Sequence, residues 1–211
     1  MERCDPMAQA QPKPITPLTF DEYLACDHGT DARYELAYGV MIEVPPETDD
    51  NISLAMGLAE ILKSLCGWRL IRTHASTLEV SPLPGVPESN RFPDLMVLSP
   101  DLAQELKGKS SAVRLSMPNP VLVAEVVSPY QNLGDDNYRR DYVDKRQQYE
   151  LRRIPEYWII DPVAQCVTVL VMGSTSYQEQ VFEGAELVIS SAFPSLQVTA
   201  KEILSQQGDS F

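Results

Sequence analysis

Two acidic residues lie in apolar segments that are typical of buried β-strands. Glu125 interrupts the apolar run at residues 121–127, and Asp94 opens another apolar run directly after Pro93. An ionised carboxylate is costly to bury unless a cation or a positive side chain faces it. Two carboxylates at the ends of adjacent strands form the oxygen donor set that Mg²⁺ or Mn²⁺ prefers. The structural alternatives are a turn or cap role for Asp94 and a buried salt bridge for Glu125.

A predicted helix at residues 136–152 follows the Glu125 strand and offers the positive charge that Glu125 requires. Helical periodicity places Lys145 on the face that also carries three tyrosines, Tyr138, Tyr142 and Tyr149. Burial among tyrosines would lower the pKa of the lysine, whereas nearby carboxylates would raise it. The alternative is an ordinary lysine at the edge of an amphipathic helix, with its aliphatic chain packed and its ammonium group in water.

The charge of the chain restricts how it could contact nucleic acid. The 211 residues include 17 Lys and Arg and 30 Asp and Glu, which gives a formal net charge of −13. Binding through the whole surface is therefore excluded, because phosphate contacts require Lys and Arg along the interface. We expect any such binding to use the predicted helix, a local basic patch, together with bridging metal ions. Its basic residues are Arg139, Arg140, Lys145, Arg146, Arg152 and Arg153.

Composition and length indicate an ordinary globular protein, with 44% hydrophobic and 22% charged residues. We expect a flexible arm at residues 1–17, one domain at residues 18–205 and a short tail at residues 206–211. The four cysteines form no C-x-x-C pair, which indicates free thiols in a reducing cytosol. No signal-peptide core and no apolar run of about 18 residues occur, so we expect a cytoplasmic protein that does not enter a membrane.

Several catalytic motifs are missing from the sequence. It contains no G-x-x-x-x-G-K-[ST] phosphate loop, no G-x-G-x-x-G fingerprint, no H-E-x-x-H and no G-x-S-x-G. The chain has two histidines, His28 and His74, which are too few for a histidine-rich metal site. Their small number also argues against a catalytic triad that uses histidine. We expect both to be surface or hydrogen-bonded residues. Carboxylates and one lysine therefore remain as the candidate chemistry.

The remaining elements follow from local signals. Thr19 and Glu22 fit a capping box that starts a short helix, and Gly29 ends it. Alternation and turn residues predict a hairpin that joins residues 34–36 to residues 41–44 through Tyr38 and Gly39. Periodicity further predicts a helix at 50–66, strands at 68–73, 78–80, 94–98 and 121–128, meander strands at 156–161, 166–172, 177–182 and 187–189, and a closing helix at 199–204.

Five short strings occur in a fixed order along the chain. They are Y-E-L-x-x-G from Tyr34, P-D at Pro93, E-V-x-S-P from Glu125, K-x-x-x-Y from Lys145 and P-E-Y-W-x-x-D-P from Pro155. In this order and spacing, over residues 17–205, the sequence resembles the Uma-two family of restriction-endonuclease-like proteins. That family is a branch of the PD-(D/E)xK nuclease superfamily.

The resemblance implies an α/β (α+β) fold of the restriction-endonuclease-like type, in which helices flank a mixed central β-sheet and an antiparallel meander is added. It also implies that Asp94 and Glu125 bind Mg²⁺ or Mn²⁺ and that Glu35 contributes a third acidic ligand. In the commonest motif of the superfamily, the lysine lies two positions after the glutamate, where this chain has Val127. The resemblance suggests that the lysine has moved to the following helix, as Lys145.

This chain departs from the family pattern at two further positions. Asn51 stands where many relatives carry a histidine, and Val40 stands where many carry an acidic residue. Glu35 also has an alternative interpretation, as a surface partner of Arg33 or Arg72.

The function expected from these residues is hydrolysis of phosphodiester bonds in DNA by a metal-dependent endonuclease, with Asp94, Glu125, Lys145 and Glu35 in the site. A homodimer is a further expectation, because two symmetric sites would cut two strands. The main alternative is a catalytically inactive nuclease-like scaffold that acts as a binding or regulatory module. A two-carboxylate glycoside hydrolase is a weaker alternative, because it leaves Lys145 unexplained.

Overall fold

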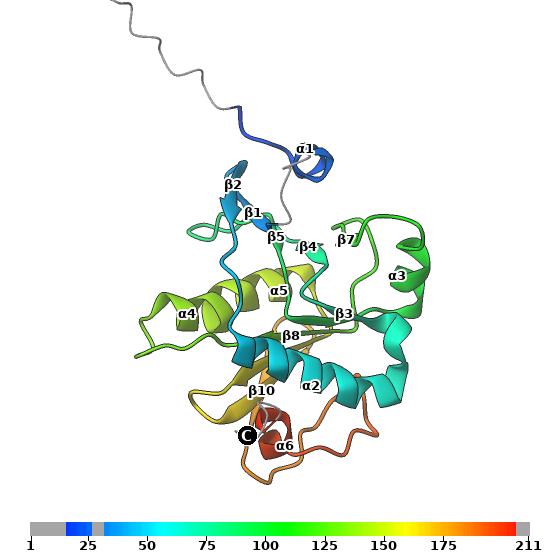
Figure 1. Cartoon of the computed structure of the whole chain (residues 1–211), viewed down its shortest axis with the longest axis vertical. Helices are drawn as coiled ribbons and strands as arrows, with labels where there is room; N and C mark the ends of the chain where they lie inside the picture. The colour runs from blue at the N-terminus through cyan, green and yellow to red at the C-terminus, as the bar shows by residue number, and fades with distance from the viewer. Residues whose placement is uncertain (1–15, 27–31, 206–211) are drawn as a thin grey trace, which may run out of the picture.

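The computed structural model describes residues 16–26 and 32–205. At its centre is a six-stranded sheet with the strand order β11-β10-β9-β8-β6-β3 (Figure 1). Neighbouring strands are antiparallel except for β8 and β9, which are parallel. The strands are β3 (Ile71–Thr73), β6 (Leu95–Val97), β8 (Leu122–Val126), β9 (Glu156–Asp161), β10 (Cys166–Met172) and β11 (Tyr177–Glu183). The predicted mixed sheet with an antiparallel meander, β9 to β11, is therefore confirmed.

The parallel pairing of β8 with β9 determines where the lysine-bearing helix lies. A parallel pair requires a crossover connection, which is usually helical. Here the crossover helix comprises α4 (Asp136–Arg139), a π-helical segment η2 (Arg140–Lys145) and α5 (Arg146–Arg152). It shares a hydrophobic cluster with one face of the sheet and with α3 (Pro100–Glu105). The chain therefore returns Lys145 to the strand that carries Glu125.

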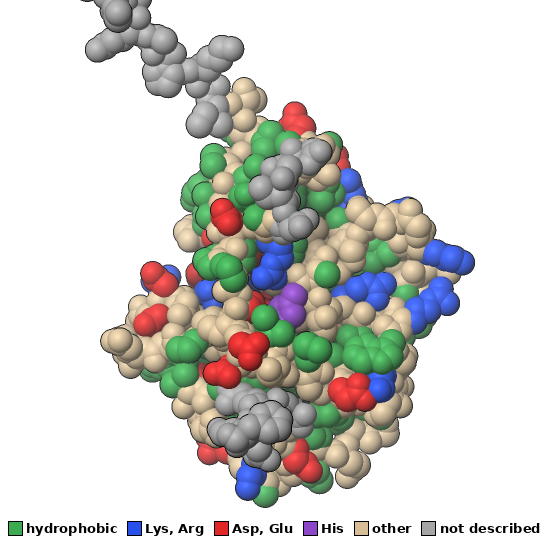
Figure 2. Space-filling view, in the orientation of Figure 1, with side chains coloured by type: hydrophobic (Ala, Val, Ile, Leu, Met, Phe, Trp, Pro, Cys, Tyr) green, Lys and Arg blue, Asp and Glu red, His purple; other side chains and the backbone are tan. Residues whose placement is uncertain are grey.

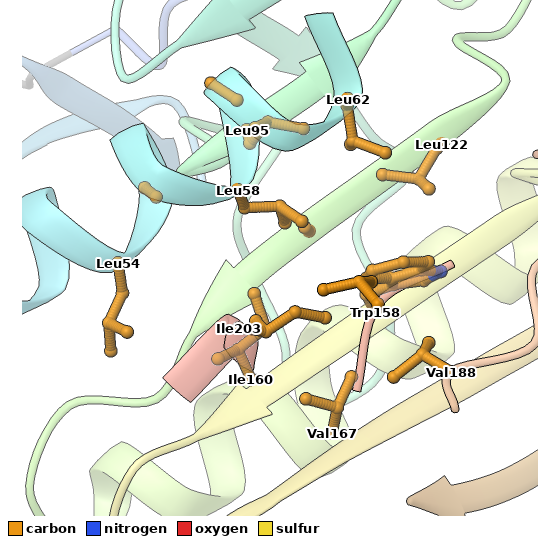
Figure 3. Close-up of a cluster of buried hydrophobic side chains, with 14 of the residues drawn as sticks. Leu54, Leu58, Leu62, Leu95, Leu122, Trp158, Ile160, Val167, Val188 and Ile203 are labelled. Atoms are coloured by element: carbon orange, nitrogen blue, oxygen red, sulfur yellow. The ribbon is translucent and has the colours of Figure 1, made fainter. Parts of the chain in front are cut away.

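The other face of the sheet is covered by α2 (Asp49–Cys66) and α6 (Ala200–Leu204). Leu54, Leu58 and Leu62 recur at every fourth residue of α2 and are fully buried. Figure 3 shows these leucines on the side of α2 that faces Trp158 and the strands of the sheet. Burial of this apolar stripe attaches α2 to the sheet.

A smaller layer lies at one end of the central sheet (Figure 1). It contains α1 (Phe20–Ala25), the hairpin of β1 (Tyr34–Ala37) and β2 (Val40–Glu43), and a three-stranded sheet of β4 (Thr77–Glu79), β5 (Asn90–Arg91) and β7 (Ala112–Val113). The predicted capping box of Thr19 and Glu22 starts α1. In the hairpin turn, Tyr38 and Gly39 have φ angles of 50° and 76°, as a two-residue turn requires. A Cβ at Gly39 would lie 2.4 Å from the Cβ of Pro17, so only glycine fits there.

Two local predictions differ from the structure, and one helix was not predicted. Residues 187–189 form no strand and make only an isolated bridge through Leu187. The predicted strand at residues 68–73 begins instead with a 3₁₀ helix, η1 (Trp68–Leu70). Helix α3 is an element that the sequence analysis missed, although Ser99 caps it and Pro100 lies in its first turn.

Some predictions fall outside the described residues. These are the structure of the arm up to residue 15, the helix end at Gly29, the states of Cys4 and His28, and the tail at residues 206–211. The assignment of one domain to residues 18–205 stays a prediction. Among the described residues, no helix is both long and apolar enough to cross a membrane.

We expect Leu58→Ala to lower the free energy of unfolding by about 3 kcal/mol, because the substitution leaves a cavity between α2 and the sheet. Met56→Ala should change it by less than about 0.5 kcal/mol, since the side chain of Met56 is 60% exposed on the same helix. Urea unfolding followed by tryptophan fluorescence measures both values. Equal losses in the two variants would contradict the packing of α2 on the sheet.

Candidate active site

The pairing of β6 with β8 brings Asp94 beside Glu125. Leu95 pairs with Ala124, so Asp94 and Glu125 are the next opposed positions of the antiparallel register. The main-chain N–H of Val126 donates to Oδ2 of Asp94 over 2.7 Å. Asp94 is 4% exposed and Glu125 is fully buried. The two predicted carboxylates therefore lie on adjacent strands, as the sequence indicated.

Lys145 meets Glu125 from the crossover helix. Its Nζ donates to Oε2 of Glu125 over 2.8 Å and lies 2.7 Å from Oδ1 of Asp141. The hydroxyl of Tyr149 donates to Oε1 of Glu125 over 2.6 Å. Both carboxylate oxygens of Glu125 thus accept a hydrogen bond from the crossover helix. Lys145 supplies the positive charge that a buried carboxylate requires.

A π-helical segment sets the direction of these side chains. η2 widens the helix between residues 140 and 145, and its last residue, Lys145, contacts Glu125. The hydroxyl of Tyr157 donates to the main-chain oxygen of Asp141 over 2.9 Å, which anchors the segment to the sheet. Single π-helical turns inside α-helices occur frequently at functional sites.

The predicted tyrosine stripe is divided by this segment. Tyr138 and Tyr142 stack on each other, with ring centroids 4.3 Å apart. Tyr149 instead packs edge-on against Tyr157, with centroids 5.0 Å apart. The ring contacts thus differ on the two sides of η2, although Tyr142 and Tyr149 belong to the same hydrophobic cluster on the sheet.

Asp141 is a residue of this cluster that the sequence analysis did not identify as part of the site. Its side chain is 1% exposed and it contacts Lys145 and, over 3.5 Å, Nη2 of Arg140. The signal that could have found it is the spacing of four residues between Asp141 and Lys145, at which oppositely charged side chains meet on a helix.

The electrostatics of the cluster decide the protonation of the lysine. Burial raises the pKa of Glu125 to about 7; Lys145 opposes this shift, and the carboxylates of Asp94 and Asp141 add to it. Burial alone would lower the pKa of Lys145, but the carboxylates of Asp141 and Glu125 outweigh it and hold that pKa above its usual value. Lys145 is therefore a charged ammonium group at neutral pH.

Glu35 lies on the hairpin and has a partner that the sequence did not indicate. Nη1 of Arg91 donates to Oε2 of Glu35 over 2.8 Å, and Nη2 of Arg91 donates to Glu88 over 2.9 Å. The Nε–H of Arg91 donates to Gln148 of α5 over 2.8 Å. Glu35 therefore pairs with a nearly fully buried arginine, Arg91, and not with the surface arginines that the sequence suggested. Through these bonds Arg91 also joins the hairpin to the crossover helix.

A cavity of about 470 Å³ lies between the hairpin and the crossover helix. Glu35 and Lys145 both line it, from opposite walls. The other charged residues of its lining are Glu43, Glu47, Glu88, Arg91, Asp136, Arg139, Arg140 and Asp144. The structure therefore brings two of the four predicted site residues to one cavity, and Lys145 connects that cavity to Glu125.

His74 contacts Asp94, which nothing in the sequence indicated. Its Nδ1 lies 3.3 Å from Oδ1 of Asp94, and its main-chain N–H donates to the main-chain oxygen of Asp94 over 3.2 Å. His74 adopts a φ of 49°, an uncommon conformation for a residue other than glycine. Turn geometry after a strand brings the two residues together, and this long-range contact has no signature in the sequence.

The donor set suits a hard divalent cation, although it is small. Among the described residues, no group of three or more His, Cys, Asp and Glu side chains could hold a metal ion. Asp94 and Glu125 remain, and Mg²⁺ is typically held by one or two carboxylates and several waters. The main-chain oxygen of Val126 accepts from Nδ2 of Asn51 over 3.4 Å. The role of Glu35 as a third ligand stays a prediction.

The predicted basic patch on the crossover helix is largely used in internal contacts. Arg146 pairs with Glu179 over 2.5 Å, and Lys145 is buried. Arg152 donates to the main-chain oxygens of Glu79 and Arg114, and Arg153 donates to that of Gly173. Arg139, however, is exposed, lines the cavity and forms no salt bridge among the described residues, so the expectation that this helix contacts nucleic acid stays a prediction.

Comparison with solved structures finds the fold in another protein. The chain superimposes with a TM-score of 0.67 on a crystal structure from Anabaena variabilis that is described as a "putative nuclease belonging to DUF820". The two chains are 19% identical, and the similarity covers 90% of this chain and 99% of the other. No curated protein matches this chain.

The family comparison covers nearly the whole of the described structure. The Uma2 family, described as "Putative restriction endonuclease", matches residues 20–201. This is the family that the five sequence strings resembled. Since the match spans most of the chain, the protein belongs to the Uma2 family of restriction-endonuclease-like proteins.

Proposed function

We propose that the protein is a metal-dependent nuclease that hydrolyses phosphodiester bonds in DNA at the cavity between the hairpin and the crossover helix. The observation that carries this proposal is the contact of Lys145 with Glu125 over 2.8 Å, with Asp94 on the adjacent strand. An acidic pair beside a lysine is the chemistry that metal-assisted phosphoryl transfer uses. Membership of a family described as a restriction endonuclease supports the same conclusion.

The charges around Glu125 favour a bound cation. Asp94, Glu125 and Asp141 are all buried, and the positive charges that contact the cluster are those of Lys145 and Arg140. Asp94, Glu125 and the carbonyl of Val126 are the groups that would hold Mg²⁺ or Mn²⁺. When bound, such an ion polarises a phosphate oxygen and lowers the pKa of bound water.

Lys145 acts in this proposal as a fixed positive charge. Because the carboxylates of Asp141 and Glu125 hold its pKa above the usual value, it is a poor general base at neutral pH. An ammonium group fixed in a nearly buried position can instead stabilise negative charge that develops on the phosphate. Asp141 is then a positioning residue, since it contacts Nζ of Lys145 from the same helix.

Glu35 belongs to the opposite wall of the cavity. We place it in the site as the third acidic group, held in direction by Arg91. The glycoside hydrolase alternative gives no role to Lys145, which contacts Glu125 over 2.8 Å. Homodimer formation and the cytoplasmic location stay predictions.

We expect Asp94→Asn and Lys145→Met to lower the rate of plasmid nicking in Mg²⁺ by about 100-fold or more, since each removes a charge that the transition state needs. Glu183→Ala is the matched control, because Glu183 is an exposed carboxylate at the end of the edge strand β11. Gel analysis of supercoiled plasmid gives all three rates, and circular dichroism checks folding. A folded Asp94→Asn protein that nicks DNA at the original rate would refute the mechanism.

Metal binding can be measured without turnover. We expect calorimetric titration with Mn²⁺ to show binding to the unmodified protein and at least about 10-fold weaker binding to Asp94→Asn, because a charged oxygen ligand is lost. Glu183→Ala should bind Mn²⁺ as the unmodified protein does. Binding without nicking would favour the inactive-scaffold alternative, whereas equal affinity in all three proteins would exclude Asp94 as a ligand.

The stability of the metal-free protein should depend on the proton of Glu125. Its pKa is raised from 4.5 to about 7 on folding, so the folded state binds more protons than the unfolded state between these values. The free energy of unfolding in a chelator should therefore contain a component that falls as pH rises from 4.5 to 7. Glu125→Gln cannot ionise and should lack this component. Parallel stability curves for the two proteins in urea would contradict it.

A further inference from the structure

Most basic side chains of the crossover helix contact an acid or a main-chain carbonyl of the protein. A second group of basic side chains, outside this helix, forms no salt bridge with an acid. Salt bridges among the described residues use Lys63, Arg91, Arg114, Arg140, Lys145 and Arg146. Within the part of the chain that the structure describes, no salt bridge joins an acid to Arg33, Arg69, Arg72, Lys107 or Lys109. Arg139, Arg152, Arg153 and Lys201 also form no salt bridge within the described residues, so the first five are distinguished by their common position.

These five cations, here called the basic strip, follow the edge of the central sheet. β3 is the last strand of the sheet, and its pairing of Thr73 with Leu95 places its end beside Asp94. Arg72 lies one residue earlier on β3, and Arg69 lies in η1, directly before the strand. Helix α3 packs on η1, and Lys107 and Lys109 follow α3. The strip therefore runs from the candidate active site to the far end of the strand.

The near end of the strip contacts the site itself. Nη1 of Arg33 donates to the main-chain oxygen of His74 over 3.2 Å, and His74 contacts Asp94. The guanidinium of Arg33 lies 5.8 Å from the ring centroid of Phe92, which lines the cavity. The strip and the cavity are thus continuous through Arg33.

Acidic residues are scarce around the strip. Residues 61–78 and 106–124 contain no Asp or Glu, although acids outnumber bases in the chain. Figure 2 shows Lys and Arg side chains gathered on the side of the molecule where η1 and α3 lie, whereas Asp and Glu lie mainly elsewhere on this face. Two acids, Asp101 and Glu105, lie on α3, and neither forms a salt bridge within the described residues.

Part of the strip has a structural use as well. Nη1 of Arg72 donates to the main-chain oxygens of Arg69 and Ile71, over 3.0 and 2.8 Å, which protects the edge of the sheet. Lys107 and Lys109 are exposed and have no side-chain hydrogen bond within the described residues, and Arg69 is exposed too. Edge protection therefore does not explain the two lysines and Arg69.

We infer that the basic strip binds the phosphate backbone of duplex DNA and directs it into the cavity. The inference rests on the proposed function and adds the surface that would hold the substrate. A row of unpaired cations complements a row of phosphates, and each phosphate neutralised by Lys or Arg adds about 0.9 to the slope of log affinity against log salt. The strip thus supplies the contact that the overall negative charge of the chain otherwise opposes.

The test compares one lysine of the strip with one lysine elsewhere. Lys109→Gln and Lys201→Gln each remove one exposed lysine, and Lys201 lies on α6, on the face of the sheet covered by α2. Fluorescence anisotropy with a labelled duplex in a chelator, between about 50 and 200 mM salt, gives the slope. We expect Lys109→Gln to lower its magnitude by about 0.9 and Lys201→Gln to leave it unchanged. The triple variant Arg69→Gln, Lys107→Gln, Lys109→Gln should lower it by about 2 to 3.

The outcomes separate this inference from the proposed function. If the unmodified protein binds duplex DNA but the Lys109→Gln and triple variants keep its slope, the basic strip is refuted and nicking by the site residues still stands. If no binding occurs at any salt, the strip is likewise refuted. If single-stranded RNA of equal length binds more tightly through the same residues, the assignment to DNA is overturned. If the strip variants lose slope while Asp94→Asn keeps it but cannot nick, both proposals are supported separately.

Discussion

The structure depends on one buried charge, the carboxylate of Glu125 in β8. A buried carboxylate without a partner would destabilise the fold, so the crossover helix must bring Lys145 and Tyr149 to it. The same requirement orients Asp141, which completes the environment of the lysine. Removal of Lys145 would therefore affect both folding and chemistry, and the two effects must be measured separately.

Much of the fold could be predicted because its signals are local. The capping box at Thr19, the hairpin turn at Gly39 and the apolar stripe of α2 each depend on residues a few positions apart. The Glu125 and Lys145 contact was also within reach, because a strand, its crossover helix and the next parallel strand are consecutive. Adjacent strands likewise explain why Asp94 could be placed beside Glu125.

The remaining parts of the site depend on contacts between distant segments. The approach of His74 to Asp94 depends on the pairing of β3 with β6, and the salt bridge of Arg91 with Glu35 depends on the packing of β5 beside the hairpin. A π-helical turn has no reliable sequence signal, so the orientation of Asp141 was missed. The sequence also does not show which basic side chains of the crossover helix are free to bind a ligand. Arg146, for example, forms a salt bridge with Glu179 on β11.

The π-helical segment makes the site sensitive to a kind of sequence change that substitutions do not reproduce. Each residue of an α-helix turns the chain by about 100°, so deletion of one residue within η2 would rotate either Lys145 or the residues before it away from the sheet. Asp141 and Lys145 would then face different directions while every element of the fold stayed in place. Related sequences should therefore keep the number of residues in this segment more strictly than the identity of each residue. An alignment gap here would indicate a different arrangement of the site residues.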